Sequence, residues 1–381
     1  MALKKTILAI VNRTFQYESS IGDGLLQLAE KTSTEGSVYV ITQAKCDLKR
    51  ELDKAGRGQG LHIFTCKAFT TSASDLIKRI AESIYFMLWA LISLVRSRPT
   101  SVYVATDPPV LVPFVVAIYC RLFNAQYVYH LQDIHPEAAN IVVPLNGLVM
   151  KLLLAIDNYT LRHAKALVTL SEDMKSYLLK RSNTQSPIYL LDNPSFDMAS
   201  TLIAQRTKDI VFCGNAGRLQ RIPLLITAIS DYLSKGGKLR FTFCGGGVHA
   251  PEIKALADAY DQVDYLGIIP ASDAAELINQ HRWALLPIDD EVTKYAFPSK
   301  SSGYALSGAG VLAICGENTS VARWVEQHEV GLVCAADHDA LVSCFFSLES
   351  NTHGPFMIGH DMRAKLQIPY FAQHLSDIIF T

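Results

Sequence analysis

The sequence has 381 residues, of which 49% are hydrophobic and 19% charged, and its formal net charge is −1 at pH 7. These values exclude a disordered or low-complexity chain, and the length suffices for two domains of about 100 to 200 residues each. None of the eleven histidines belongs to an HExxH motif, so the sequence gives no support to a zinc hydrolase.

The chain opens on an expected strand. The apolar run from Thr6 to Val11 follows two lysines, as the core of a signal peptide does. It is only six residues long, however, and no small-residue cleavage site follows it. We therefore interpret this run as the first strand of the fold.

Short apolar runs rich in Val, Ile and Tyr then alternate with helical patterns along the chain. The expected strands are KTILAIV, SVYVIT, LHIFTC, SVYVAT, AQYVYHL, ALVTL, IYLL, DIVFC, LRFTFCG, VDYLG, WALLPI, GVLAIC and GLVC. Segments such as LLQLAEKT, PEIKALADAY and DALVSCFFSL have apolar residues three and four apart, which predicts amphipathic helices. The alternation predicts parallel sheets covered on both faces, with ligands bound beyond the carboxyl ends of the strands.

One helical segment, Ile84 to Val95, is apolar on all sides. Lys78, Arg79, Arg96 and Arg98 flank it, and its twelve residues fall short of the about 20 that span a bilayer. Two interpretations remain open. The segment is either a helix of the protein core or a helix embedded in one leaflet of a membrane.

Charge gathers where an expected buried strand ends. The stretch QDIHPE, residues 132–137, follows AQYVYHL and places Asp133, His135 and Glu137 at the carboxyl end of that strand. Carboxylates at such positions commonly cap the next helix, so their position alone favours a structural role.

A polar stretch with Asn193-Pro194 at its centre, LDNPSFDMASTLIAQRTKD, is the expected linker between two doubly wound domains. The charge balance changes there. Residues 1–195 carry 21 Lys and Arg against 16 Asp and Glu, whereas the remainder carries 14 against 20. A basic first half suits anionic lipid or a phosphorylated acceptor, although unrelated domains also differ this much by chance.

The eight cysteines show neither a CxxC pair nor the spacing of a zinc site. Several of them end apolar runs that are expected to be strands. We therefore expect buried thiols in a reducing cytoplasm.

Two glycine clusters, FCGNAGR (212–218) and FCGGG (243–247), each follow a strand and precede a helical pattern. Such turns let backbone amides approach a phosphate, although tight turns favour glycine for steric reasons alone. The first cluster lacks the full GxGxxG pattern and no acidic residue follows the second strand, which disfavours a nicotinamide enzyme. Arg218 is either a donor of charge-assisted hydrogen bonds to a diphosphate or a solvated surface residue.

A second candidate anion site is FPSKSSGYALSGAG, residues 297–310. Pro298 and Ser299 can start a helix, with Ser299 as its cap, and Lys300 then projects from the first turn. A lysine is unfavourable at the positive end of a helix dipole, so it needs either solvent or an anion beside it.

These motifs together resemble those of family 4 of the nucleotide-sugar-dependent glycosyltransferases, also called group 1, and particularly their bacterial polysaccharide branch. The residues that carry the resemblance follow the family's order over nearly the whole chain: Asp107-Pro108-Pro109, Asp133-Ile134-His135-Pro136-Glu137, Ser171-Glu172-Asp173-Met174, Asn193-Pro194, Gly214 to Arg218, Gly245 to Gly247 and Pro298-Ser299-Lys300. Each motif is weak by itself, and the ordered series is specific.

The resemblance implies an α/β protein of the GT-B fold, with two Rossmann-like doubly wound domains facing across a cleft. We expect an acceptor-side domain at residues 1–195 and a nucleotide-sugar-binding domain at 196–360. A C-terminal helix at 361–381 is expected to pack back toward the N-terminal domain.

The resemblance also assigns roles to residues. Asp133 is the expected catalytic residue, which orients or deprotonates the acceptor hydroxyl or stabilises positive charge on the sugar ring. His130, His135, which stands where the family usually has tryptophan, and Glu137 are expected to be acceptor-side or structural. The expected diphosphate clamp, Arg218 with Lys300, needs neither a metal nor a cofactor. The donor-binding residues that the resemblance implies are Gly22, Gly24, Gly214, Asn215, Gly217, Arg218, Gly245, Gly247, Ser299 and Lys300.

Two departures from the family pattern stand out. Gly303 occupies the position of a glutamate that normally holds the donor's ribose, and Gly310 replaces a proline. Either another group holds the ribose, or the donor differs, or the protein has weak or no transferase activity.

The sequence therefore predicts a glycosyltransferase of cell-surface polysaccharide biosynthesis that moves a sugar from a nucleotide diphosphate donor to a hydroxyl of a saccharide or lipid-linked saccharide. Family membership implies retention of the anomeric configuration. We expect a cytoplasmic protein without a nucleic-acid partner, and peripheral contact with the inner face of the membrane stays open. The alternatives are a nucleotide-sugar epimerase, which needs a fuller set of acid and base residues, and an inactive partner of another transferase.

Overall fold

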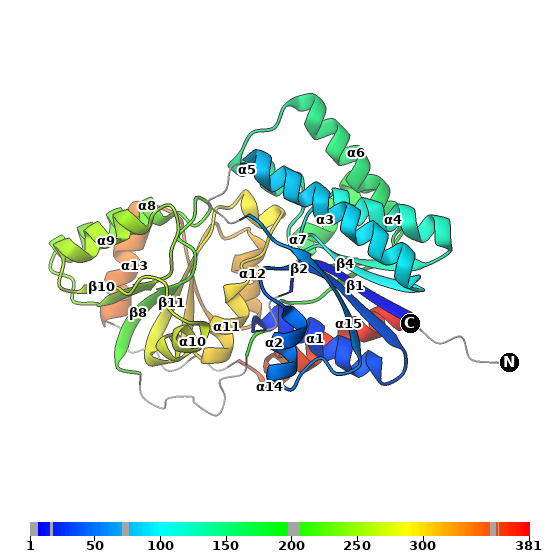
Figure 1. Cartoon of the computed structure of the whole chain (residues 1–381). Helices are drawn as coiled ribbons and strands as arrows, with labels where there is room; N and C mark the ends of the chain where they lie inside the picture. The colour runs from blue at the N-terminus through cyan, green and yellow to red at the C-terminus, as the bar shows by residue number, and fades with distance from the viewer. Residues whose placement is uncertain (1–6, 16–17, 71–75, 197–205, 351–355, 357) are drawn as a thin grey trace. The chain divides into compact units, whose positions relative to one another are not determined.

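The computed structural model describes residues 7–15, 18–70, 76–196, 206–350, 356 and 358–381 and divides the chain into two compact units. Unit 1 comprises Met1–Asn193 and Ile368–Thr381, and unit 2 comprises Pro194–Gln367. Residues 197–205 of the expected linker lie outside the described residues. Figure 1 shows the helices and strands of both units.

Unit 1 is built on one parallel sheet of seven strands in the order β3-β2-β1-β4-β5-β6-β7. The strand order reverses beside β1, so the carboxyl ends of β1 and β4 flank the switch point at which such sheets bind ligands. The strands are β1 (Ile7–Thr14), β2 (Ser37–Ala44), β3 (Leu61–Lys67), β4 (Ser101–Ala105), β5 (Gln126–His130), β6 (Ala166–Thr169) and β7 (Ile188–Leu190).

Helices cover the sheet of unit 1, as Figure 1 shows. Leu8 and Ile10 of β1 share a buried apolar cluster with Leu25 of α1 and Phe371 of α15, so these two helices close one core of the unit. The helices of this unit are α1 (Ser20–Ser33), α2 (Leu48–Lys54), α3 (Leu76–Ser97), α4 (Leu111–Phe123), α5 (Glu137–Val142), α6 (Gly147–His163), α7 (Glu172–Ser182) and α15 (Ile368–Phe380).

Unit 2 repeats this plan with a parallel sheet of six strands in the order β10-β9-β8-β11-β12-β13. The order reverses beside β8, which places a second switch point between β8 and β11. Its strands are β8 (Lys208–Cys213), β9 (Phe241–Cys244), β10 (Val263–Tyr265), β11 (His281–Pro287), β12 (Gly310–Ile314) and β13 (Gly331–Cys334).

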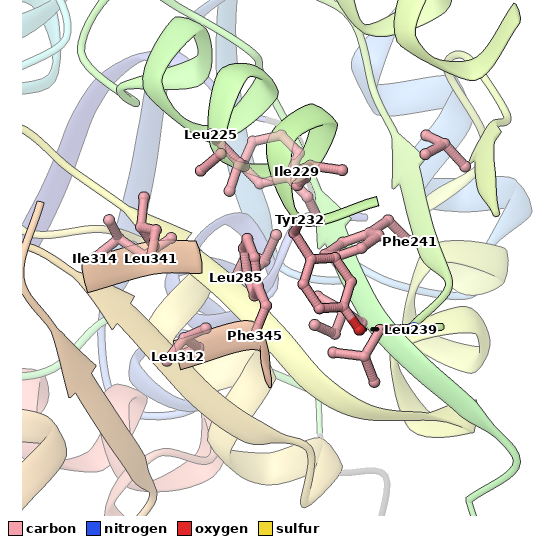
Figure 2. Close-up of a cluster of buried hydrophobic side chains, with 14 of the residues drawn as sticks. Leu225, Ile229, Tyr232, Leu239, Phe241, Leu285, Leu312, Ile314, Leu341 and Phe345 are labelled. Carbon is pink, nitrogen blue, oxygen red and sulfur yellow. Dashed lines mark hydrogen bonds between the residues drawn. The ribbon is translucent and has the colours of Figure 1, made fainter. Parts of the chain in front are cut away.

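The helices of unit 2 surround an aromatic-rich core. Tyr232 of α8 packs edge-on against Phe241 of β9 and Phe345 of α13 (Figure 2). Its hydroxyl group accepts a hydrogen bond from the backbone of Leu239 at 3.0 Å, so the buried polar atom has a partner. The helices are α8 (Ile222–Ser234), α9 (Ala250–Ala259), α10 (Ala271–Gln280), η2 (Val292–Lys294), α11 (Lys300–Ser307), α12 (Ser320–Gln327), α13 (His338–Ser350) and α14 (His360–Lys365).

The C-terminal boundary differs from the expected one at residue 361, since residues 361–367 stay with unit 2. The Arg363 guanidinium donates a hydrogen bond to the carbonyl of Leu306 at 3.1 Å. The amide of Ser195 donates to the carbonyl of Leu366 at 2.8 Å. These bonds hold α14 in unit 2, and the return to unit 1 begins at Ile368 with α15.

The apolar segment Ile84 to Val95 is the centre of a longer helix, because α3 spans 22 residues. Among the described residues, its part Ile77–Ser97 is the one helix long and apolar enough to cross a membrane, by length and composition only. One side of α3 is buried in unit 1 through Phe86, Ala90 and Leu94. The segment is thus a core helix on that side and exposes apolar residues on the other.

All eight cysteines are free thiols. Six are buried as expected, but Cys46 is exposed and Cys344 is half-buried. Cys46 lies in the turn between β2 and α2, outside any strand, and so escapes burial.

Candidate functional site

The two glycine clusters form adjoining turns at the carboxyl ends of β8 and β9. A Cβ atom on Gly245 would lie 2.0 Å from the carbonyl oxygen of Gly214, and Gly245 has a φ of +119°. Gly247, with a φ of +132°, would bring a Cβ within 2.4 Å of the Ala216 carbonyl oxygen. Only glycine fits both positions, because any side chain would collide with backbone in a conformation that L residues rarely adopt.

Backbone hydrogen bonds join the two turns. The amide of Gly214 donates to the Cys244 carbonyl at 2.8 Å, and the amide of Ala216 donates to the Gly246 carbonyl at 2.6 Å. The amide of Gly245 donates to Gly267 at 2.7 Å. Gly214 and Gly245 therefore shape the turn through their small size, because their N–H groups are already used inside the protein.

Lys300 lies against this pair of turns. A Cβ on Gly214 would meet the Lys300 Cε at 2.3 Å, so the lysine side chain fills the space that glycine leaves. Its Nζ stands 4.3 Å from the centre of the Phe212 ring, within the range of a cation–π contact. The structure thus brings together Lys300 and the first glycine cluster, which the sequence separates by more than 80 residues.

Burial lowers the pKa of the Lys300 amine to about 8. The amine is therefore mostly, but not completely, protonated near neutral pH, and an anion beside it would stabilise the charged form. A desolvated cation at the mouth of two glycine turns can neutralise a phosphate more strongly than a solvated one.

Tyr304 anchors the helix that carries Lys300. Its hydroxyl donates to the carbonyl of Cys213 at 3.0 Å and accepts from the amide of the same residue at 3.1 Å. These two hydrogen bonds to the end of β8 hold α11 against the glycine turn. Sequence reasoning gave Tyr304 no role, because the bond joins residues 91 positions apart.

The remaining predicted donor-binding residues of unit 2 are close in sequence to Gly214 or Lys300, and most of them are exposed to solvent. Asn215, Arg218 and Ser299 are exposed, and Gly217 is half-buried. A Cβ on Gly217 would meet the Asn215 side-chain nitrogen at 2.9 Å, so Asn215 folds over that glycine. Ser299 is the N-cap residue of α11 as expected, but its side chain makes no cap bond, because its backbone has the helical dihedral angles −61° and −17° and not the extended conformation of a typical cap.

The position of the missing glutamate is partly filled. A Cβ on Gly303 would lie 3.2 Å from the Ser195 hydroxyl oxygen, a contact tighter than most Cβ contacts. Ser195 is held there by its bridge to Gln367. The change to glycine therefore accompanies a linker that runs close to α11.

An acidic pair beyond β11 is a feature that sequence reasoning missed. Asp290 accepts a hydrogen bond from the amide of Gly316 at 2.9 Å and pairs with the Arg221 guanidinium at 3.3 Å. Arg221 also pairs with Asp289 at 3.6 Å. The signal was present, since two aspartates directly follow the buried run WALLPI.

In unit 1, Asp133 follows β5, and its side chain is exposed to solvent. The protein atoms around its carboxyl group nevertheless desolvate it and raise its pKa, while the nearby His135 lowers it. Its expected structural alternative, a cap of α5, has no support, because Pro136 is the N-cap and that helix end has no side-chain cap.

His135 stands beside Asp133 with one ring nitrogen unused. Burial lowers the pKa of the His135 imidazole, whereas the carboxylates of Asp133, Glu137 and Asp107 raise it. Its Nδ1 is buried and has no hydrogen-bond partner among the described residues. A neutral imidazole in this position can exchange a hydrogen bond with a ligand hydroxyl.

His130 is fully buried at the end of β5. Its Nδ1 lies 2.8 Å from the Tyr103 hydroxyl, and burial lowers the pKa of the imidazole to about 4. The ring is therefore neutral at physiological pH. Its Nε2 is buried without a hydrogen-bond partner among the described residues, so His130 is a core histidine in which one ring nitrogen has a partner.

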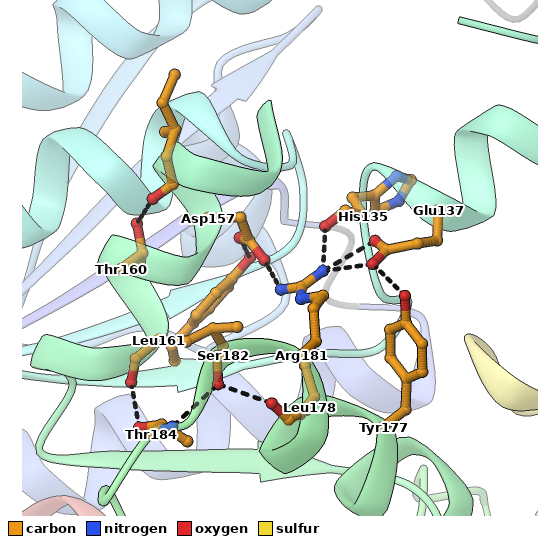
Figure 3. Close-up of polar contacts among 12 residues, drawn as sticks. His135, Glu137, Asp157, Thr160, Leu161, Tyr177, Leu178, Arg181, Ser182 and Thr184 are labelled. Atoms are coloured by element: carbon orange, nitrogen blue, oxygen red, sulfur yellow. Dashed lines mark hydrogen bonds and ion pairs between the residues drawn. The ribbon is translucent and has the colours of Figure 1, made fainter. Parts of the chain in front are cut away.

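Glu137 is the centre of a buried ion-pair network, drawn in Figure 3. Arg181 of α7 donates to both Glu137 carboxylate oxygens, at 2.9 and 2.8 Å, and pairs with Asp157 of α6. The same guanidinium donates to the carbonyl of His135 at 3.1 Å, and Tyr177 donates to Glu137 at 2.7 Å. Glu137 thus holds the loop that carries Asp133 and His135, through an arginine that sequence reasoning missed.

Asp107 closes the switch point of unit 1. Its carboxylate pairs with the Arg13 guanidinium at 2.7 Å and accepts from the Thr14 amide at 3.1 Å. Its carbonyl accepts from the Arg13 amide at 2.9 Å. The Asp-Pro-Pro motif therefore ties the end of β4 to the end of β1.

The two glycines expected to bind donor from unit 1 have structural contacts within it. A Cβ on Gly24 would lie 2.6 Å from the Phe371 ring, so its small size lets α15 pack closely on α1. The amide of Gly22 donates to the Ser19 hydroxyl at 3.1 Å as part of the helix cap. Their donor-binding role stays a prediction.

No group of three or more His, Cys, Asp or Glu side chains that could hold a metal occurs among the described residues.

Comparisons with known proteins give a consistent result. A family model described as glycosyl transferases group 1 matches residues 207–351. The probable glycosyltransferase WbjE of Pseudomonas aeruginosa is 21% identical over 277 residues, which are 68% of each chain. Sucrose-phosphate synthase of Thermosynechococcus elongatus has a TM-score of 0.71 at 14% identity over 98% of both chains. Anabaena HepE, solved with UDP-glucose, has a TM-score of 0.61 at 14% identity over 98% of this chain and 95% of that one.

Proposed function

We propose that this chain, which has the GT-B fold and matches the glycosyl transferases group 1 model over residues 207–351, is a glycosyltransferase that moves a sugar from a nucleoside diphosphate donor to a hydroxyl of a saccharide or lipid-linked saccharide. The observation that carries the proposal is the contact between Lys300 and the Gly214 turn. HepE, a neighbour in fold, was solved with UDP-glucose, which supports a nucleotide sugar as the ligand of this chain.

In this proposal the donor's diphosphate binds at the turns of β8 and β9. Lys300 and the exposed Arg218 neutralise the charge that grows on the diphosphate as the sugar leaves. Because two cations can do this, the reaction needs no metal. The leaving diphosphate, while still bound, helps to take the proton of the acceptor hydroxyl, and the product keeps the anomeric configuration of the donor.

Replacing either cation tests the clamp. Lys300→Ala and Arg218→Ala should each weaken donor affinity by about tenfold or more, the scale of a hydrogen bond to a charged group, and should slow transfer as well. The matched control is Lys294→Ala, an exposed lysine of the same unit that pairs with Glu291. Donor affinity measured by calorimetry that is unchanged in both clamp variants would exclude the clamp.

The pH dependence of donor binding follows from the low pKa of Lys300. The amine is charged below about pH 8 and neutral above it, so donor affinity should fall as pH rises through that value. Lys300→Arg keeps its charge over the whole range, and its affinity should stay level there. Parallel pH profiles for wild type and Lys300→Arg would show that Lys300 does not contact the diphosphate.

On the acceptor side, Asp133 is the residue proposed to orient the attacking hydroxyl or to stabilise charge on the sugar ring. His135 beside it has a ring nitrogen, Nδ1, without a hydrogen-bond partner among the described residues and is proposed to lie on the acceptor side, whereas the fully buried His130 has a structural role. We place the reaction in cell-surface polysaccharide biosynthesis, at the cytoplasmic side of the membrane. WbjE, a probable glycosyltransferase, supports the transferase reading.

A screen of nucleotide sugars for thermal stabilisation separates the proposal from its alternatives. The proposal predicts that at least one donor raises the melting temperature and then transfers its sugar to an acceptor. An epimerase would bind the donor and invert one of its carbons without an acceptor. An inactive partner protein would show no stabilisation by any donor.

A further inference from the structure

Unit 1 exposes a stripe of large apolar side chains along α3. The stripe runs at intervals of three and four residues and therefore lies on one side of the helix. Ile77 is 81% exposed and Ile92 is 62% exposed, although side chains of this kind are usually buried. The stripe consists of Ile77, Ile80, Ile84, Leu88, Ile92 and Val95.

A second apolar element is the segment that runs from α5 into α6. None of the residues from Ala138 to Ile156 is buried, although the segment AANIVVPLNGLVMKLLLAI contains one charged residue, Lys151. Leu148 is 78% exposed and Leu152 is 61% exposed, and both lie on the first turns of α6. An exposed segment this apolar is typical of an interaction site.

The two elements belong to one layer. Within unit 1, α3 contacts α4, and α4 contacts α6. Figure 1 shows the three helices beside one another. The end of α4 adds Leu122 and Phe123, which are also exposed. The combined apolar surface is larger than scattered surface residues would give, which marks it as an interaction site.

Charge on this layer has a single sign. The acidic residues of α3, α5 and α6 are Glu82, Glu137 and Asp157, and all three are buried. Glu82 is satisfied by the backbone amides of Phe69 and Thr70, at 2.6 and 2.9 Å. The exposed Lys and Arg residues on α3, α4 and α6 are Lys78, Arg79, Arg96, Arg121, Lys151 and Arg162.

We infer that the outward face of α3, α4 and α6 docks on an anionic lipid bilayer, with the start of α6 entering the headgroup region. Apolar side chains flanked by arginine and lysine match a surface that is apolar beneath and negative above. A second copy of this chain fits less well, because a symmetric contact would place the basic residues opposite themselves.

The ion-pair network links this surface to the candidate catalytic segment. Arg181 joins Asp157, on α6, to Glu137 and to the carbonyl of His135, two residues beyond Asp133. A bilayer that holds α6 therefore holds the Asp133 loop near its surface. This step rests on the proposed function and assigns the acceptor to the lipid-linked class.

Vesicle flotation tests the inference. The purified full chain should float with vesicles of phosphatidylcholine and phosphatidylglycerol, and rising salt should release it. The double variant Leu148→Ser with Leu152→Ser should bind the vesicles at least roughly tenfold more weakly than wild type, because it removes the side chains that enter the bilayer. The matched control is Val248→Ser with Ile268→Ser, two exposed apolar residues of unit 2 that should leave flotation unchanged.

Three results would overturn the inference. One is equal flotation of wild type and the α6 variant, and another is equal binding to neutral and anionic vesicles. The third is a dimer in solution that the α6 variant dissociates, which would assign the surface to a second copy. Donor binding in solution is measured separately. If wild type binds no donor, the proposed function is contradicted, whereas the inferred membrane surface is not.

Discussion

Asp133→Asn is expected to lower turnover by about 100-fold or more at saturating donor and acceptor, while donor affinity stays close to that of wild type. Asparagine keeps the shape of the side chain and removes its charge and basicity. The loss therefore falls on the step in which the acceptor hydroxyl attacks or positive charge develops on the sugar. The pKa of Asp133, which its surroundings raise, keeps the carboxylate ready to take part in proton exchange.

A melting curve and a surface variant serve as controls for Asp133→Asn. Asp53→Asn changes an exposed aspartate of the same unit and should leave both turnover and melting temperature unchanged. Because α5 has no side-chain cap, a stability loss in Asp133→Asn is not expected. Wild-type turnover in a well-folded Asp133→Asn protein would end the catalytic assignment.

Arg181→Met is expected to lower the free energy of unfolding by about 3–5 kcal/mol, the usual cost of breaking a buried ion pair from one side. The side chain of Arg181 is 8% exposed, and its loss leaves the carboxylates of Glu137 and Asp157 buried without their cation. Burial already raises the pKa of Asp157 to about 6 with the arginine present. Urea unfolding of wild type and variant measures the difference.

A triple variant separates the charge effect from a packing effect. Arg181→Met with Glu137→Gln and Asp157→Asn removes the buried charges together and should recover most of the lost stability. In the single variant the fully buried Asp157 lacks the cation that lowers its pKa, so the pKa of its carboxyl group lies above that of the unfolded chain. The deficit of the single variant should then shrink as pH falls from about 8 to about 5. A deficit that is equal at both pH values would show that Arg181 acts by packing alone.

The strands of both sheets were predictable because buried parallel strands are continuous apolar runs. Each of the runs from KTILAIV to GLVC overlaps one of the strands β1 to β13, although several strands extend one to three residues beyond the run. The glycine clusters were predictable for a related reason, since turns in which a Cβ would touch backbone admit no other residue. The doubly wound topology follows from these local patterns.

The contacts that complete the site were harder to predict from the sequence. Arg181 lies 44 residues from Glu137 on a polar helix, where the sequence shows an ordinary surface arginine. The contact of Lys300 with Gly214 and the bond of Tyr304 to Cys213 also join distant segments, and only the fold brings them together. Sequence periodicity reports which face of an element is apolar, and it does not report which partner covers that face.

The apolar segment from α5 into α6 shows the same limit. Its sequence is consistent with a buried core helix, yet none of its residues between Ala138 and Ile156 is buried. The C-terminal boundary moved from residue 361 to Ile368 because hydrogen bonds of Arg363 and Ser195 hold the intervening segment in unit 2. Such bonds leave no mark in the hydrophobic pattern.

The measurement that tests the central claim most directly is sugar transfer by the purified chain, followed by mass spectrometry of the acceptor and by release of nucleoside diphosphate. Wild type, given a nucleotide sugar that stabilises it and a lipid-linked saccharide in vesicles, should add one sugar residue to the acceptor for each diphosphate released. Lys300→Ala should lose both signals together, because the same clamp binds the donor and stabilises the leaving group. A donor that binds tightly and is returned as its epimer, or is never consumed with any saccharide acceptor, would contradict the assignment as a glycosyltransferase.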